Sequence, residues 1–150
     1  GGDIQAMEEP DLQIAQSVSK FERIRKAHQS EVAEDYVEMI AGLIDETGEA
    51  RAVDLASRFG VKSPTVNATI QRLQREGLVI SKPYRSIFLT DAGKSLAEAS
   101  KKRHDVVRNF LIKIGVHPSV AEEDAEGVEH HVSLETLAIF SEFIKKAQST

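Results

Sequence analysis

The segment from residue 124 to residue 131 carries acidic and imidazole side chains at spacings that suit a metal ion. Its sequence is DAEGVEHH, in which Glu126, Glu129 and His130 stand at positions i, i+3 and i+4. At about 100° per residue, these three side chains fall on one face of a helix. Neighbouring carboxylates repel one another, and a divalent cation reverses the sign of that interaction. The segment therefore predicts part of a metal site, with a solvated acidic helix as the alternative.

Further candidate ligands lie in two other segments that are expected to be helical. Asp35 and Glu38 are spaced i, i+3 in the first of these segments and can share a ligand, but Glu31 and Glu34 have the same spacing. Periodicity alone does not choose between the two pairs. His104 lies in the middle of a later helical segment, where a single histidine is by itself no sign of a metal site.

Charge is unevenly distributed along the chain, whose net charge is −5. Residues 51–90 contain seven basic and two acidic side chains, which gives a local charge of +5. Residues 118–150 contain seven acidic and two basic side chains, which gives −5. This segregation indicates an anion-binding surface in the middle of the chain and a cation-binding or solvated surface near its end.

The basic middle segment has the pattern of a helix-turn-helix. A short helix is expected to end at Gly60, and a second should begin at Ser63 and Pro64, because serine is a preferred N-cap and proline suits the first helical position. Two short helices joined by such a turn form a DNA-binding motif. The second helix turns polar, groove-reading side chains away from its apolar stripe. We predict that the helix contacts DNA through Ser63, Thr65, Asn67, Ala68, Gln71 and Arg72.

A β-hairpin is expected directly after this second helix. Two apolar runs, residues 78–80 and 87–89, flank a polar turn that contains a proline. A hairpin in this position is the wing of a winged helix, and its tip would bring Tyr84 and Arg85 to DNA phosphates or to the minor groove. The alternative is a small α+β lobe with a basic surface.

The pattern as a whole predicts a mainly α-helical protein with a small β-hairpin wing. We expect a flexible N-terminal tail over residues 1–16, a winged helix-turn-helix domain over residues 17–90, and a helical domain over residues 91–150. Thr90 and Ser133 are predicted to cap helices of the last domain, and a helix is expected from Pro118 to His131. That domain has more apolar side chains than so short a segment can bury alone, which favours a dimer interface.

Composition excludes several other classes of protein. The 150 residues contain no cysteine, which rules out disulfides, thiolate zinc sites and a cysteine nucleophile. Hydrophobic residues make up 41% of the chain, yet none of the apolar runs approaches the length of a membrane span. These properties fit a cytoplasmic globular protein with no membrane partner.

Several short motifs occur in an order that is typical of one family. They are Asp35-Tyr-Val-Glu38, Ser63-Pro-Thr-Val66, Tyr84-Arg85, Arg103-His104, and the segment from Asp124 to His131 followed by Val-Ser. In these motifs the chain resembles the manganese-responsive repressors of the diphtheria-toxin-repressor family over roughly residues 30–147. The resemblance implies a winged helix-turn-helix domain followed by a helical metal-binding and dimerisation domain.

The resemblance also implies a ligand set and a role. The implied metal ligands are Asp35, Glu38, His104, Glu126, Glu129 and His130. The implied cofactor is Mn(II), with up to two ions per subunit. The iron-responsive branch has methionine and cysteine where this chain has Asp35 and Glu126, and hard oxygen donors suit manganese better than sulfur does. The expected function is a transcriptional repressor that binds double-stranded DNA at a palindromic operator as a metal-loaded homodimer and represses metal-uptake genes.

Three alternatives stay open at this point. The chain could be a winged-helix regulator that responds to another divalent metal, such as iron or zinc, or to an organic ligand. A dimetal carboxylate enzyme is less favoured, because Glu126 and His130 are spaced i, i+4 rather than in the Glu-x-x-His pattern of dimetal bundles. Neither an activated nucleophile nor a phosphate-binding glycine loop is evident in the sequence, so we expect a protein that is not an enzyme.

Overall fold

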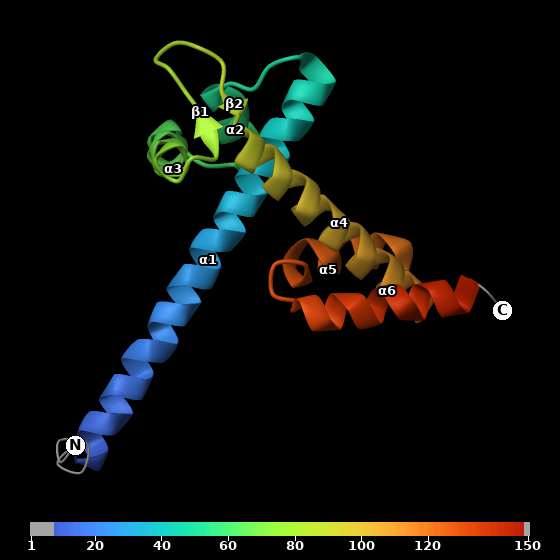
Figure 1. Ribbon diagram of the computed structural model, residues 1–150. Helices are drawn as coiled ribbons and strands as arrows, with labels where there is room; N and C mark the ends of the chain where they lie inside the picture. The colour runs from blue at the N-terminus through green and yellow to red at the C-terminus, as the bar shows by residue number, and fades with distance from the viewer. Residues whose placement is uncertain (1–7, 149–150) are drawn as a thin grey trace. The chain divides into compact units, whose positions relative to one another are not determined.

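The computed structural model describes residues 8–148 and is mainly helical (Figure 1). Its elements in chain order are α1 (Glu9–Thr47), α2 (Ala52–Phe59), α3 (Ser63–Arg75), β1 (Val79–Ile80), β2 (Phe88–Leu89), α4 (Asp91–Lys113), α5 (Pro118–Val128) and α6 (Leu134–Gln148). The chain divides into two units, Gly1–Val32 and Ala33–Thr150, which we describe separately. None of the helices among residues 8–148 is both long enough and apolar enough to cross a bilayer.

The first unit differs from the tail that we expected. Residues 1–7 of that predicted tail lie outside the described residues, but α1 begins at Glu9 rather than near Ser17. Pro10 suits the first turn of a helix, and the acidic Glu9 and Asp11 favour the positive end of the helix dipole. Residues 8–30 are exposed, including Val18 and Phe21, which lie on the same side of the helix.

The second unit contains the predicted helix-turn-helix. Gly60 ends α2 in the left-handed conformation, with φ of 66°, as the sequence indicated. Val66, Ile70 and Leu73 of α3 are buried, as expected from their spacing. The predicted cap is wrong by one residue, because α3 already includes Ser63 and the cap position is Lys62, whose side chain makes no capping hydrogen bond. Pro64 stands in the first turn, which supplies a preorganised start without a side-chain cap.

The predicted wing is present and is held against neighbouring segments. Strands β1 and β2 pair antiparallel, with Val79 opposite Leu89, and Ile87 forms a further bridge to Ala50. Tyr84 is fully exposed at the turn, where its φ of 60° lies in the left-handed region. The start of α4 approaches the segment before β1 so closely that only glycine fits at position 93, because a Cβ there would lie 2.1 Å from the Leu78 carbonyl oxygen.

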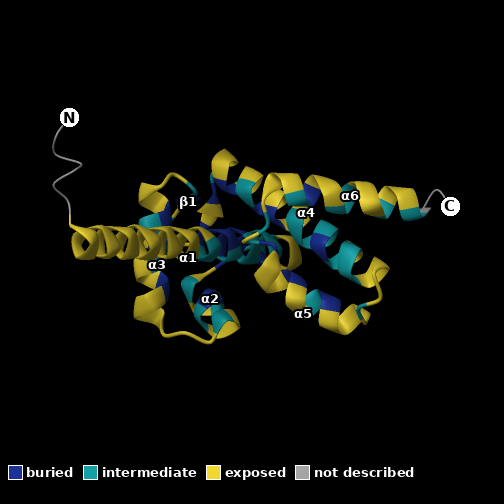
Figure 2. Ribbon diagram, turned by 90° about the horizontal axis from the view of Figure 1, so that it is seen from below, coloured by how far each residue is buried: buried dark blue, intermediate teal, exposed yellow. Residues whose placement is uncertain are grey.

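The last three helices pack together in the second unit, with α5 and α6 both against α4 (Figure 1). Thr90 caps α4 by accepting a hydrogen bond from the Gly93 amide at 3.1 Å, and Ser133 accepts one from the Thr136 amide at 3.1 Å. Both caps were predicted. The core of this region is formed by Val107, Ala125 and Leu137 with the partly buried Val106, Leu111, Val132 and Phe140. Much of the surface of α5 and α6 is exposed (Figure 2).

Candidate metal centre and nucleic-acid interface

Five of the six implied metal ligands line one cavity of about 570 Å³. Asp35 and Glu38 reach it from α1, His104 from α4, and Glu126 and Glu129 from the end of α5. The sixth residue, His130, contacts two of these side chains. The structure therefore brings together residues that are up to 95 positions apart in the sequence.

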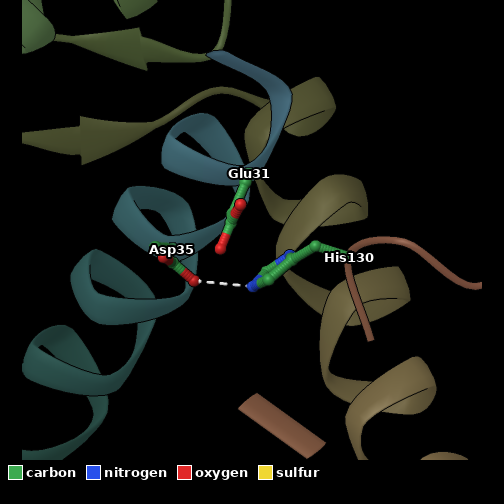
Figure 3. A group of neighbouring side chains, drawn as sticks. All are labelled: Glu31, Asp35 and His130. Carbon is green, nitrogen blue, oxygen red and sulfur yellow. Dashed lines mark ion pairs between the residues drawn. The ribbon is translucent and has the colours of Figure 1, made fainter. Parts of the chain in front are cut away.

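His130 lies at the centre of this group. Its side chain is 1% exposed, and its Nε2 atom is 2.9 Å from the Asp35 Oδ1 atom (Figure 3). The same Nε2 atom is 3.4 Å from the Glu129 Oε1 atom. On α4, the His104 Nδ1 atom is 3.3 Å from the other oxygen of Glu129. Glu129 therefore has one histidine beside each of its carboxylate oxygens.

Burial and like charge both act on Glu129, which is only 2% exposed. Burial, together with the nearby carboxylates of Glu38 and Asp35, raises the pKa of Glu129 to about 8, against the lowering effect of Arg103. Below about pH 8 such a carboxyl group tends to keep its proton, and a bound cation favours the release of that proton.

The donor atoms of this cluster suit a divalent cation. Buried polar atoms normally have hydrogen-bond partners, and those that lack one require an explanation. Among the described residues, the buried Glu38 Oε1, Glu129 Oε2 and His130 Nε2 atoms complete no hydrogen bond, although His104 lies 3.3 Å from Glu129 Oε2 and Asp35 lies 2.9 Å from His130 Nε2. Carboxylate oxygens with imidazole nitrogens are the donors that manganese and related metals accept. The unsatisfied atoms therefore fit a metal ion.

The raised pKa of Glu129 has a consequence for the stability of the metal-free protein. Its ordinary value is 4.5 and its folded value is about 8, so between these pH values the folded state keeps a proton that the unfolded chain has released. The free energy of unfolding should therefore fall as pH rises through this range, by up to about 1.4 kcal/mol per pH unit. Urea unfolding of the metal-free protein at several pH values between 5 and 8 measures this slope.

The same titration on Glu129→Gln supplies the control, because glutamine does not titrate. The variant should lose most of the pH dependence and exceed the wild type in stability at pH 8. A wild-type slope that persists unchanged in the variant would assign the effect to another group.

Glu126 differs from the other candidate ligands in its exposure. It lines the cavity but is exposed, whereas Glu129 is buried. The helix that we expected to reach His131 ends at Val128, so His130 lies in the following turn. Glu129 keeps a helical backbone, with φ of −54° and ψ of −34°, and its amide donates to the Ala125 carbonyl at 3.0 Å. The shared helical face therefore extends to Glu129, while the turn redirects His130.

Sequence reasoning missed two acidic residues that contact the histidines. Glu34 is buried beside the His130 Nδ1 atom at 2.5 Å, and Glu122 lies 2.7 Å from the His104 Nε2 atom and lines the same cavity. The hydrogen bond from His104 lowers the pKa of Glu122. The spacing of Glu34 in the first helix was noted, but only the packing of α1 against His130 distinguishes it from its neighbours.

A second cavity, of about 800 Å³, lies between α3 and the wing. Four of the eight predicted DNA contacts line it, namely Asn67, Gln71, Tyr84 and Arg85. Its lining also includes Arg51, Gln74 and Lys82. Basic and amide side chains around a groove beside an exposed helix are suited to phosphates and base edges.

The other four predicted DNA contacts do not line this groove. Ser63, Thr65 and Ala68 are exposed on α3. Arg72 is partly buried, and its Nε atom is 3.6 Å from the Glu76 carboxylate one turn later. Arg51 was overlooked because it stands before α2 and only the fold brings it to the groove.

Comparison with known proteins gives two family matches that together cover most of the chain. Residues 28–87 match the iron dependent repressor, N-terminal DNA binding domain. Residues 90–150 match the iron dependent repressor, metal binding and dimerisation domain. The junction between the two matches falls at the end of the wing, close to the boundary that we predicted at residue 90.

Curated relatives are similar over nearly the whole chain. The transcriptional regulator MntR of Escherichia coli O6:H1 (strain CFT073) is 48% identical over 135 residues, which are 90% of this chain and 87% of that protein. The transcriptional regulator MntR of Salmonella typhimurium (strain LT2) is 47% identical over 135 residues, which are 90% of this chain and 86% of that protein.

Solved structures show the same fold. A manganese-dependent transcriptional repressor in complex with manganese superposes with a TM-score of 0.68 at 29% identity, covering 75% of this chain and 52% of the other. The manganese regulator SloR gives a TM-score of 0.66 at 25% identity, covering 75% and 53%. This chain thus spans about half the length of these structural relatives. The resemblance seen in the short motifs is confirmed over both matched domains, and the chain belongs to the iron-dependent repressor family.

Proposed function

We propose that this chain is a Mn(II)-dependent transcriptional repressor that binds a palindromic operator as a homodimer and represses metal-uptake genes in the cytoplasm. In this role it is a regulator and not an enzyme. The observation that carries the proposal is the cluster of carboxylates and imidazoles that joins α1 to α4 and to the turn after α5. The proposed ligands are Asp35, Glu38, His104, Glu126, Glu129 and His130.

The choice of Mn(II) rests on the chemistry of the donors. The proposed set contains four carboxylates and two imidazoles and no sulfur ligand. Oxygen donors suit Mn(II), whereas thiolate or thioether donors favour softer metals. The relatives whose names and titles refer to manganese support the same choice. Raw affinity does not select Mn(II), because it lies at the weak end of the divalent series, so geometry and metal availability must do so.

The link between this cluster and DNA runs through α1. A bound divalent ion supplies positive charge that offsets the repulsion among the clustered carboxylates. Asp35 and Glu38 belong to the same helix whose Tyr36 stacks on Phe59 of α2, at 4.5 Å between ring centroids. The position of α1 is therefore coupled to the helix-turn-helix. Fixing Asp35 and Glu38 against His104 and His130 fixes the orientation of α3 relative to the C-terminal helices.

The orientation of α3 matters for DNA binding because the proposed homodimer presents two copies of α3. Two recognition helices must lie about 34 Å apart to enter successive major grooves of a palindrome. The C-terminal helices offer exposed apolar side chains for such a dimer, including Leu134, Ile139 and Phe143 of α6. Without metal, the dimer samples several separations of its two recognition helices, and only some of these fit the operator. Metal binding to the cluster favours the separation that fits.

Operator binding should therefore depend on Mn(II). A palindromic duplex selected from random DNA in the presence of Mn(II) should bind 5- to 150-fold more tightly with Mn(II) than with chelator, at constant ionic strength, since allosteric couplings are typically about 1–3 kcal/mol. Fluorescence anisotropy measures both affinities, and Mg(II) at the same concentration controls for simple charge screening.

Equal affinity in chelator and in Mn(II) would contradict the switch. If calorimetry also gave no heat on adding Mn(II) to the metal-free protein, the alternative of an organic ligand would be favoured.

A further inference from the structure

We propose that Glu34 and Glu122 are positioning residues that decide which ring nitrogen each histidine presents to the metal centre, and that two arginines of α4 hold them in place. This inference rests on the proposed metal centre and adds two residues to it. Neither carboxylate needs to touch the ion. Their role would be to accept the outer N–H of a histidine, as carboxylates beside metal-binding histidines commonly do.

We call each carboxylate together with its arginine an arm. The first arm, Glu34 with Arg103, acts on His130. Its Nδ1 atom is 2.5 Å from the Glu34 Oε2 atom, and the other oxygen of Glu34 is 2.5 Å from the Arg103 Nη2 atom. The side chains of His130 and Glu34 are 1% and 9% exposed, so water does not compete freely with either contact. The opposite ring nitrogen, Nε2, faces Asp35 and Glu129.

The second arm, Glu122 with Arg108, acts on His104. Here the outer ring nitrogen is Nε2, whereas in His130 it is Nδ1. The His104 Nε2 atom is 2.7 Å from the Glu122 Oε1 atom, and the other oxygen of Glu122 is 3.4 Å from the Arg108 Nη1 atom. The inward atom is Nδ1, which faces Glu129 at 3.3 Å. Arg103 and Arg108 stand one residue before and four residues after His104 on α4, so one helix supplies a ligand and both anchors.

The two arms predict opposite tautomers for the two histidines. A carboxylate only accepts hydrogen bonds, so the ring nitrogen beside Glu34 or Glu122 carries a proton, and a metal ion can bind only the other nitrogen through its lone pair. In the metal-free protein the inward nitrogens also face the carboxyl groups of Asp35 and Glu129, so the opposition between the two rings applies to the metal-loaded centre. His130 should therefore be protonated on Nδ1 and offer Nε2 to the metal. His104 should be protonated on Nε2 and offer Nδ1. A purely structural role for Glu34 and Glu122 requires no such opposition.

The test combines ring-nitrogen spectra of the protein loaded with diamagnetic Zn(II) with calorimetric titration of Mn(II). Long-range ¹H–¹⁵N spectra at a pH where both rings are neutral report each tautomer, and His104→Gln and His130→Gln assign the signals. Glu122→Met keeps the side-chain length but removes the acceptor. It should shift His104 toward a tautomer mixture, leave His130 unchanged, and weaken Mn(II) binding by about 10- to 100-fold.

Glu34→Met should have the reciprocal effect on His130. The matched control is Glu123→Met, an exposed position next to Glu122 on α5 with the same change of charge, and it should alter neither tautomers nor affinity. If the buried Glu34 variant does not fold, the half-exposed Glu122 carries the test by itself, since its side chain is 46% exposed.

Identical tautomers for His104 and His130 in the wild type would overturn the inference. It would also be overturned if Glu122→Met weakened Mn(II) binding without changing the His104 spectrum, because the residue would then act through charge or as a direct ligand. Failure of the wild type to bind Mn(II) is a different result. It would contradict the proposed function, while the spectra of the Zn(II)-loaded protein would still decide whether the two arms set the tautomers.

Discussion

Replacing Glu129 with glutamine is expected to weaken Mn(II) binding by more than about 100-fold, since losing a mere outer partner of a ligand already costs 10- to 100-fold. Glu129 is the residue that both histidines contact, with His104 beside one oxygen and His130 beside the other. Glutamine keeps the shape but removes the negative charge and one acceptor oxygen. Calorimetric titration of the metal-free variant with Mn(II) measures the loss.

The same variant should be more stable than the wild type when metal is absent, because a group whose pKa is raised to about 8 resists ionisation in the fold. Opposite changes in metal affinity and in metal-free stability are hard to obtain from misfolding. Glu123→Gln on the exposed side of α5 is the control and should change neither quantity. Wild-type affinity for Mn(II) in Glu129→Gln would remove this residue from the metal centre.

Replacing Gln71 with alanine should weaken operator binding by about 5- to 150-fold and leave Mn(II) binding unchanged, since a bidentate side chain on a base edge is worth about 1–3 kcal/mol. Gln71 is exposed on α3 and lines the groove beside the wing. Anisotropy with the selected duplex in saturating Mn(II) measures the change, and calorimetry verifies that the metal site is intact.

Gln74 provides the comparison on the same helix. Its Oε1 atom already accepts a hydrogen bond from the Ser81 amide at 3.2 Å, so Gln74→Ala should affect sequence preference less than Gln71→Ala. If Gln71→Ala bound the selected duplex as tightly as the wild type, base reading would have to be assigned to other residues of α3.

The sequence alone predicted the elements well where local chemistry determines them. Gly60 could be recognised as a helix end because a left-handed residue there favours glycine, and Thr90 as a cap because its hydroxyl reaches the amide three residues later. The start of α1 was predicted too late, since the periodicity of apolar residues was followed and the signals of Pro10 and its acidic neighbours were not.

Residue spacing could not predict the contacts between segments that are distant along the sequence. Asp35 and Glu38 could not be preferred over Glu31 and Glu34 from periodicity, and only the resemblance to a family selected them. The contact between Glu34 and His130 joins residues 96 positions apart, and it depends on how α1 packs against α4 and the turn after α5. Residue type alone was also an unreliable guide to exposure. Arg72 has the residue type of a base reader, yet it is partly buried beside Glu76.

The most direct test of the account is diffraction from crystals of the full chain grown with Mn(II), measured on both sides of the manganese absorption edge. We expect one or two anomalous peaks per subunit at coordination distance from side chains of the proposed ligand set, among them Asp35, Glu129 and His130. Absence of any such peak between α1 and the turn after α5, or peaks only elsewhere on the surface, would contradict the proposed metal centre.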